Sequence, residues 1–168
     1  KENWTEVIAH REDVFLEGVE IFSDYLVHEE RQEGLNKLRV MPWDGSAEHY
    51  IEMGEEVYTN SISVNPEFDS KVLRYRYSSL TTPSTIYDYR MDSREKKLMK
   101  QDEVLGGTFD PANYEAKRLY AVADDGKKIP MSIVYRKGIE LNGSNPTLLY
   151  GYGSYGHTMD PGFRSYRL

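Results

Sequence analysis

The part of this 168-residue chain with the clearest chemical potential is a run of tyrosines separated by glycines near residue 152. Glycine allows tight turns and positive φ, and a tyrosine held beside such a turn presents a phenol that can donate a hydrogen bond. Functional residues often lie on loops that a rigid scaffold positions, so we expect a binding or catalytic site here. The run reads Tyr150-Gly151-Tyr152-Gly153-Ser154-Tyr155-Gly156.

The same run formally matches G-x-G-x-x-G, the fingerprint of dinucleotide-binding proteins. That fingerprint requires a helix that opens at the last glycine, with an acidic residue about 20 positions further on. Here the next residues read HTMDPG, which is typical of a turn. Bulky Tyr152 and Tyr155 would also hinder the close approach of a pyrophosphate. We therefore do not expect a nucleotide site.

The sequence shows no nucleophile of a serine hydrolase. A serine hydrolase needs an activated nucleophile, a base, an orienting acid and donors for the oxyanion. The nucleophile is usually marked by G-x-S-x-G, and this sequence contains no such motif. Ser154 lies in Gly153-Ser154-Tyr155-Gly156, one residue short of the pattern. We therefore expect that the chain alone does not hydrolyse peptides.

Other residues that could carry chemistry lack the necessary spacing. The histidines are scattered without metal-ligand spacing, and the chain has no cysteine, so we expect no metal and no cofactor. Neighbouring carboxylates on a strand point to opposite faces, so we interpret Glu29-Glu30-Arg31 as a solvated strand end. The histidines are His10, His28, His49 and His157.

Composition and charge exclude several function classes. The formal net charge is -7, whereas nucleic-acid binders usually carry a basic patch, so no nucleic-acid partner is expected. No stretch approaches the roughly 18 apolar residues of a membrane span. The absence of cysteine suits a reducing compartment, and we expect a cytoplasmic protein. The chain begins at Lys1 without an initiator methionine, which suggests a piece of something longer.

Residues 1–105 are predicted to form short strands separated by turns. In Val72–Tyr77, for example, Leu73 and Tyr75 alternate with Arg74 and Arg76, as in a strand with one buried face. The predicted strands are Val14–Phe22, Asp24–Glu30, Leu35–Trp43, His49–Met53, Val57–Val64, Val72–Tyr77, Ile86–Met91 and Lys97–Gln101.

These strands repeat along the chain. Leu38–Gly45 aligns with Ile86–Ser93 at an offset of 48 residues, and a short charged strand follows each copy. A period of about 40 to 50 residues with four strands is typical of β-propeller blades. The copies are only weakly similar, so the repeat alone also permits a β-sandwich.

Leu105-Gly106-Gly107 is the predicted boundary, because the sequence changes character after it. Tyr114–Ala123 and Lys128–Lys137 flank an Asp-Gly turn and predict a β-hairpin. A polar loop follows, and the apolar run Thr147–Tyr150 predicts a buried strand that leads into the tyrosines.

The segment LLYGYGSYG, preceded by GKKIPMSIVYRKG and a GSNP turn, resembles the start of the catalytic domain in prolyl oligopeptidase-family serine peptidases. The oligopeptidase B (protease II) branch is the most similar. WTEVIAHREDVFLEGVEIF, EERQEGL and VLRYRYSSLTTPSTIYDY are similar to that branch's propeller. The resemblance implies a mainly β internal fragment. Residues 1–105 would form about the last two propeller blades, and residues 106–168 would form the opening hairpin and strand of an α/β-hydrolase domain.

The resemblance also implies roles for two tyrosines. Tyr152 matches the family residue whose phenol donates to the oxyanion, and Tyr155 matches an aromatic residue that lines the pocket for the residue before the scissile bond. Prolyl-specific members have a GGF motif where this chain has Gly153-Ser154-Tyr155. That departure favours the oligopeptidase B branch, which cleaves after Lys or Arg. Either tyrosine could instead be an ordinary packing residue.

We therefore predict a fragment of a cytoplasmic serine-type oligopeptidase that hydrolyses short peptides, with the catalytic triad beyond residue 168. The propeller would exclude folded proteins, and the remainder of the catalytic domain would be a partner of this chain. The alternative is a non-catalytic β-rich module that binds a peptide or protein. Because unpaired strand edges tend to pair with other chains, we expect the isolated chain to self-associate through them.

Overall fold

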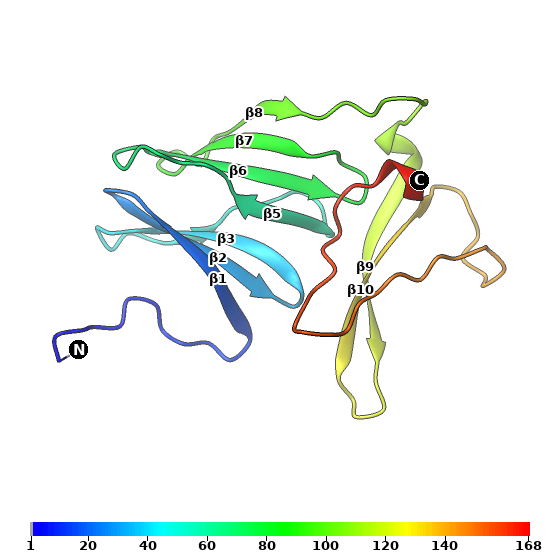
Figure 1. The fold of residues 1–168 in the computed structure, drawn as a ribbon, viewed down its shortest axis with the longest axis horizontal. Coiled ribbons are helices and arrows are strands. Elements are labelled where there is room, and N and C mark those ends of the chain that lie inside the picture. Colours follow the sequence, from blue (N-terminus) through cyan, green and yellow to red (C-terminus); the bar gives the residue numbers. More distant parts are fainter. Residues whose placement is uncertain (1) are drawn as a thin grey trace.

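The computed structural model describes residues 2–168, in which ten strands and two 3-10 helices are present. The first eight strands form two four-stranded antiparallel sheets, and each strand pairs with its neighbour in sequence (Figure 1). The first sheet contains β1 (Val14–Ile21), β2 (Tyr25–Gln32), β3 (Leu35–Pro42) and β4 (His49–Tyr50). The second contains β5 (Tyr58–Ile62), β6 (Val72–Ser79), β7 (Thr85–Arg90) and β8 (Lys96–Gln101).

We call these sheets the first and second blade, because four-stranded antiparallel sheets of this kind are the unit of a β-propeller. The predicted repeat is confirmed, since its two copies are the third strands of the two blades, β3 and β7. A short fourth strand follows in each case. All eight strands predicted for residues 1–105 are present, although the bounds differ by a few residues.

Alternating side chains explain why the blades pack face to face. In β6, Leu73 and Tyr75 are buried while Arg74 and Arg76 are exposed, as predicted. Apolar residues from one face of each blade meet between the sheets and form the main core. That core consists of Phe22, Val27, Leu38, Val40, Ile51, Met53, Leu73, Tyr75, Tyr77, Tyr89 and Met91.

Two asparagines join the blades within this interface. The Asn36 amide donates to the backbone carbonyl of Asn60 at 3.3 Å, and the Asn60 amide donates to the carbonyl of Asn36 at 3.0 Å. Both side chains are buried. Because buried backbone carbonyls need partners, this reciprocal pair stabilises the relative position of β3 and β5.

The turn between β2 and β3 requires glycine. Glu33 and Gly34 both have positive φ, at 52° and 75°. This is the two-residue turn that matches the twist of antiparallel strands, and glycine adopts its second position without steric cost.

A separate two-stranded hairpin lies beside the blades and consists of β9 (Tyr114–Val122) and β10 (Lys128–Arg136) (Figure 1). It follows the 3-10 helix η1 (Pro111–Asn113) and confirms the predicted hairpin. Arg118 fixes it to the blades: Nη2 donates to the Glu33 carbonyl at 2.6 Å, and the Arg118 amide donates to Glu56 at 3.3 Å.

The predicted buried strand Thr147–Tyr150 is wrong for this structure. These residues form no strand, and Leu148 and Leu149 are 77% and 87% exposed. A strand in a sheet needs a neighbour that satisfies its backbone groups, and no strand among residues 2–168 pairs with this run. The predicted strand His49–Met53 is also shorter, since β4 ends at Tyr50.

Candidate functional site

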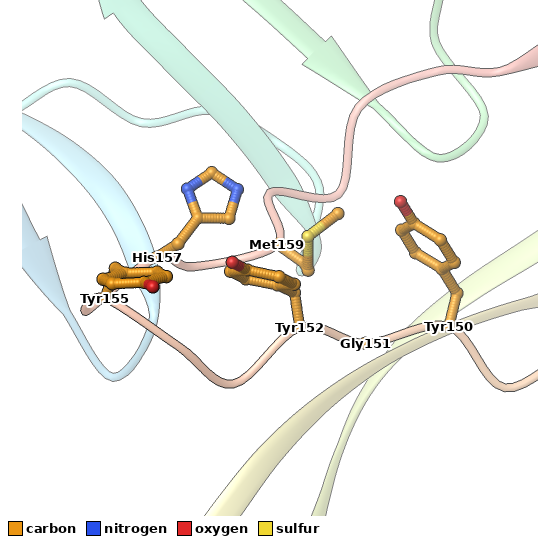
Figure 2. Close-up of a pocket in the computed structure, with 6 residues that line it drawn as sticks. All are labelled: Tyr150, Gly151, Tyr152, Tyr155, His157 and Met159. Atoms are coloured by element: carbon orange, nitrogen blue, oxygen red, sulfur yellow. The ribbon is translucent and has the colours of Figure 1, made fainter.

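The tyrosine loop, defined as residues 150–159, surrounds an open hollow of about 550 Å³. It leaves the hairpin side of the molecule and returns toward the blades, and the chain then continues to η2 (Ser165–Arg167) (Figure 1). Figure 2 shows the side chains that line the hollow on one stretch of chain. They are Tyr150, Gly151, Tyr152, Tyr155, His157 and Met159.

Tyr152 lies in the middle of this hollow, next to His157 (Figure 2). The two rings meet edge to face, with centroids 5.6 Å apart and planes at 78°. Such a contact orients an aromatic ring. Tyr152 remains 52% exposed, so its phenol can reach a bound molecule.

Tyr155 lies at the tip of the loop. It has a positive φ of 56°, and the following Gly156 has a φ of 65°. The backbone turns here, and the His157 amide donates to the Ser154 carbonyl at 3.1 Å. The turn directs Tyr155 outward, where it is 97% exposed. An outward aromatic ring of this kind can form one wall of a pocket that other residues complete.

Tyr150 occupies the opposite end of the hollow (Figure 2). The Arg167 guanidinium lies over its ring, 4.6 Å from the centroid. This cation–π contact brings the C-terminal 3-10 helix against the start of the loop.

The tyrosine loop can supply hydrogen-bond donors to a bound molecule. Its exposed phenols are suited to stabilise a negative charge. Groups of three or more His, Asp or Glu side chains that could hold a metal are absent from residues 2–168. Over the same residues, no helix is long and apolar enough to cross a membrane. The predicted site residues Tyr152 and Tyr155 therefore line the same hollow.

A second cluster of chemically capable residues, which the sequence did not reveal, surrounds Glu30 on β2. Glu30 is 1% exposed, so the prediction of a solvated strand end at Glu29-Glu30-Arg31 is wrong for this residue. Its carboxylate accepts hydrogen bonds from Tyr50 at 2.9 Å and Arg39 at 3.3 Å. It also accepts one from Arg11. His28 Nδ1 lies 3.2 Å from the same carboxylate.

Burial and hydrogen bonding shift the pKa of Glu30 in opposite directions. Burial alone raises the pKa of Glu30, but hydrogen bonds from Arg11, Tyr50 and His28 outweigh it and hold the pKa below its usual value. Burial lowers the pKa of His28. The cluster is therefore a charged carboxylate beside a neutral imidazole. It is enclosed by the first blade and the N-terminal segment, so its role is structural.

Comparison with protein families identifies the blades. Residues 1–102 match the family model described as "Prolyl oligopeptidase, N-terminal beta-propeller domain". Because this match covers more than half of the chain, it identifies the family as well as the fold.

Curated relatives match almost the whole chain. Dipeptidyl aminopeptidase BI from Pseudoxanthomonas mexicana is 43% identical over 164 residues, which are 97% of this chain and 22% of that protein. Protease 2 from Moraxella lacunata is 33% identical over 96% of this chain and 23% of that protein. The chain thus spans less than a quarter of the length of these relatives.

Solved structures give the same result. Oligopeptidase B from Leishmania major superposes with a TM-score of 0.84 at 37% identity, over 97% of this chain and 24% of that structure. Oligopeptidase B from Trypanosoma brucei, in a closed form with covalently bound antipain, gives a TM-score of 0.83 at 37% identity. That match covers 94% of this chain and 23% of the other. These matches confirm the resemblance predicted from the tyrosine loop and the segments before it.

Proposed function

The chain belongs to the prolyl oligopeptidase family, and from this premise we propose that it is the part of a serine-type oligopeptidase in which the propeller meets the catalytic domain. Residues 1–105 are two propeller blades, and residues 106–168 begin the α/β-hydrolase domain. The nucleophile, acid and base belong to the rest of that domain. The chain alone is inactive, and the parent enzyme is cytoplasmic.

Exposed apolar residues support an incomplete second domain. In the hairpin, Val122 is 71% and Ile129 is 50% exposed. Leu148 and Leu149 are exposed as well. Apolar side chains left exposed in this way support a contact site for further protein chain. We propose that the remainder of the catalytic domain covers these residues and pairs with the run Thr147–Tyr150.

Tyr152 is the residue that carries the proposal. In the parent enzyme its phenol donates to the oxyanion that forms when the serine attacks the peptide carbonyl. Its partly exposed phenol, oriented by His157 beside an open hollow, supports this role. Tyr155, on the outward turn, forms a wall of the pocket for the substrate residue before the scissile bond.

The substrate class is short peptides cleaved after Lys or Arg. The 37% identity to two oligopeptidase B structures supports this proposal, as does Gly153-Ser154-Tyr155, which departs from the prolyl-specific pattern. A second candidate activity is the release of dipeptides from free amino termini, because the 43%-identical relative is named a dipeptidyl aminopeptidase.

A matched pair of peptide substrates separates these two activities. Both substrates are dipeptides with Arg as the second residue, followed by a fluorogenic leaving group. The amino terminus is free in one substrate and acetylated in the other. An oligopeptidase cleaves both peptides at similar rates. Loss of turnover with the acetylated peptide alone would instead establish the dipeptidyl activity.

The oxyanion role is tested in the full-length enzyme, meaning a protein of the relatives' length that contains these 168 residues. Tyr152→Phe should lower kcat by about 10²–10³-fold, with little change in KM, because the lost donor acts in the transition state. Tyr120→Phe is the matched control, because Tyr120 is an exposed tyrosine of β9 that does not line the hollow, and it should leave kcat unchanged. Equal kcat for both variants would refute the role of Tyr152.

A further inference from the structure

An ion pair joins the first blade to Asp160, the residue that directly follows the tyrosine loop. Arg31, at the end of β2, donates from Nη1 to Asp160 Oδ1 at 2.8 Å and from Nη2 to Oδ2 at 3.4 Å. Its Nε donates to Glu17 of β1 at 2.6 Å. The Arg31 side chain is only 17% exposed. A guanidinium fixed by Glu17 on one side presents its other donors to Asp160 in a defined direction.

The residues just after Asp160 contact the second blade. Pro161 is buried, and the Phe163 amide donates to Ser78 Oγ at 3.0 Å. The Phe163 ring packs edge to face against Phe109, with centroids 5.0 Å apart. A hollow of about 750 Å³ lies between this segment and the second blade. Discrete contacts, rather than continuous packing, therefore hold the segment in place.

These contacts act close to the proposed oxyanion donor. Asp160 is the third residue after His157, whose ring lies against Tyr152. Among residues 2–168, no hydrogen bond or ion pair joins residues 147–157 to either blade (compare Figure 1). Within residues 2–168, polar contacts with the blades therefore come from the chain on either side of the loop, and Asp160 is the first charged residue after His157.

We propose that Arg31 is a positioning residue of the propeller, which places Tyr152 by holding Asp160. The inference rests on the proposed role of Tyr152 as the oxyanion donor. When the ion pair is formed, the loop lies at a fixed distance from the blades. When it is broken, the loop can shift, and a shift of about 1 Å at a catalytic donor is enough to slow the chemical step.

The test compares kinetics of the full-length enzyme and its variants. Arg31→Gln and Asp160→Asn should each lower kcat by about 10-fold, with little change in KM. The double variant should be no worse than either single variant, because both remove the same interaction. Asp160→Asn keeps the test valid if Arg31→Gln fails to fold.

Arg74→Gln is the matched control. Arg74 pairs with Asp88 through Nε at 2.7 Å and Nη2 at 2.9 Å, but the pair lies within the second blade. The kcat of the Arg74→Gln variant should equal that of the wild type. If Arg31→Gln also leaves kcat unchanged while Tyr152→Phe lowers it, the positioning role is refuted and the proposed function stands.

The double variant that combines Arg31→Gln with Tyr152→Phe shows whether Arg31 acts through Tyr152. If Arg31 acts through Tyr152, Arg31→Gln should have little further effect on kcat in the Tyr152→Phe background. A full additional 10-fold loss there would overturn the inference, because Arg31 would then act on another group. If Tyr152→Phe alone leaves kcat unchanged, the proposed function fails and the positioning role fails with it.

Discussion

Single residues in this chain often have roles that sequence neighbours do not reveal. Glu30 lies in a charged run, and yet it is buried beneath Arg11 and Tyr50, which are 19 and 20 positions away in sequence. Arg31 and Asp160 are 129 positions apart. Residue type and spacing marked the tyrosine loop as a candidate site, because glycine and tyrosine alternate locally, while the roles of Tyr152 and Tyr155 stay predictions from the resemblance. Partners that meet only after folding leave no such local pattern.

Glu30→Gln tests the importance of the buried carboxylate. The variant should lower the local stability of the first blade by about 3 kcal/mol, because the partly buried Arg39 and Arg11 lose the buried charge that they surround. Native-state hydrogen exchange at the amides of β2 and β3 in the full-length enzyme measures this change. Glu48→Gln is the control, since the 46%-exposed Glu48 side chain also pairs with Arg39; its effect should stay below about 1 kcal/mol.

The effect should also depend on pH with a definite sign. The folded-state pKa of Glu30 is lowered, so its charge stabilises the blade above the usual pKa of 4.5. The contribution is lost as the pH falls through the lowered value. The difference between wild type and Glu30→Gln should therefore shrink in acid. A difference that grows below pH 4.5 would contradict this account of the cluster.

At the scale of elements, the sequence predicted the strands that have one buried face, but it did not predict that the apolar run Thr147–Tyr150 forms no strand. Alternation of apolar and charged residues predicted strand β6, and turn residues predicted where most of the other strands end. The run Thr147–Tyr150 has the composition of a buried strand but no partner among residues 2–168, so it forms no strand and stays exposed. Local sequence specifies the tendency to form a strand, whereas a neighbouring strand decides whether it forms.

The β2–β3 turn links the first blade to the hairpin, and Gly34→Ala tests this link. A Cβ at Gly34 would lie 2.8 Å from Nη2 of Arg118 and would displace it from the Glu33 carbonyl. The variant should lose about 1–2 kcal/mol of local stability and speed hydrogen exchange in β9 and β10. Gly45→Ala is the control: its φ is +79° but its Cβ would have no neighbour within 4 Å. Equal exchange in the hairpin of both variants would show that Arg118 does not couple these elements.

For the whole molecule, the family resemblance carried information that the pattern of residues could not. The weak repeat allowed a sandwich or a propeller, and the match of residues 1–102 to the propeller family decided between them. The relation between the blades and the tyrosine loop was not predictable, because it depends on contacts between distant parts of the chain.

The isolated chain should self-associate through its unpaired edges and faces. Strand β1 lies at one edge of the first blade, and its Phe15 and Ile21 are 69% and 55% exposed. Exposed strand edges of this kind pair readily with other chains. Sedimentation should show species larger than a monomer, and Phe15→Lys with Ile21→Lys should reduce them. A monodisperse wild-type monomer with a cooperative thermal transition would exclude this behaviour.

The nearest-neighbour pairing of the blades has a consequence for biosynthesis. Each blade strand pairs with the strand made just before or after it, and short loops close quickly and at low entropic cost. Each blade can therefore form soon after it leaves the ribosome, whereas the Arg31–Asp160 pair must wait for 129 more residues. Pulse-labelling during refolding should find β2 and β3 amides protected before the Phe163 amide. Nascent enzyme would thus carry finished blades for some time before its tyrosine loop is fixed in place.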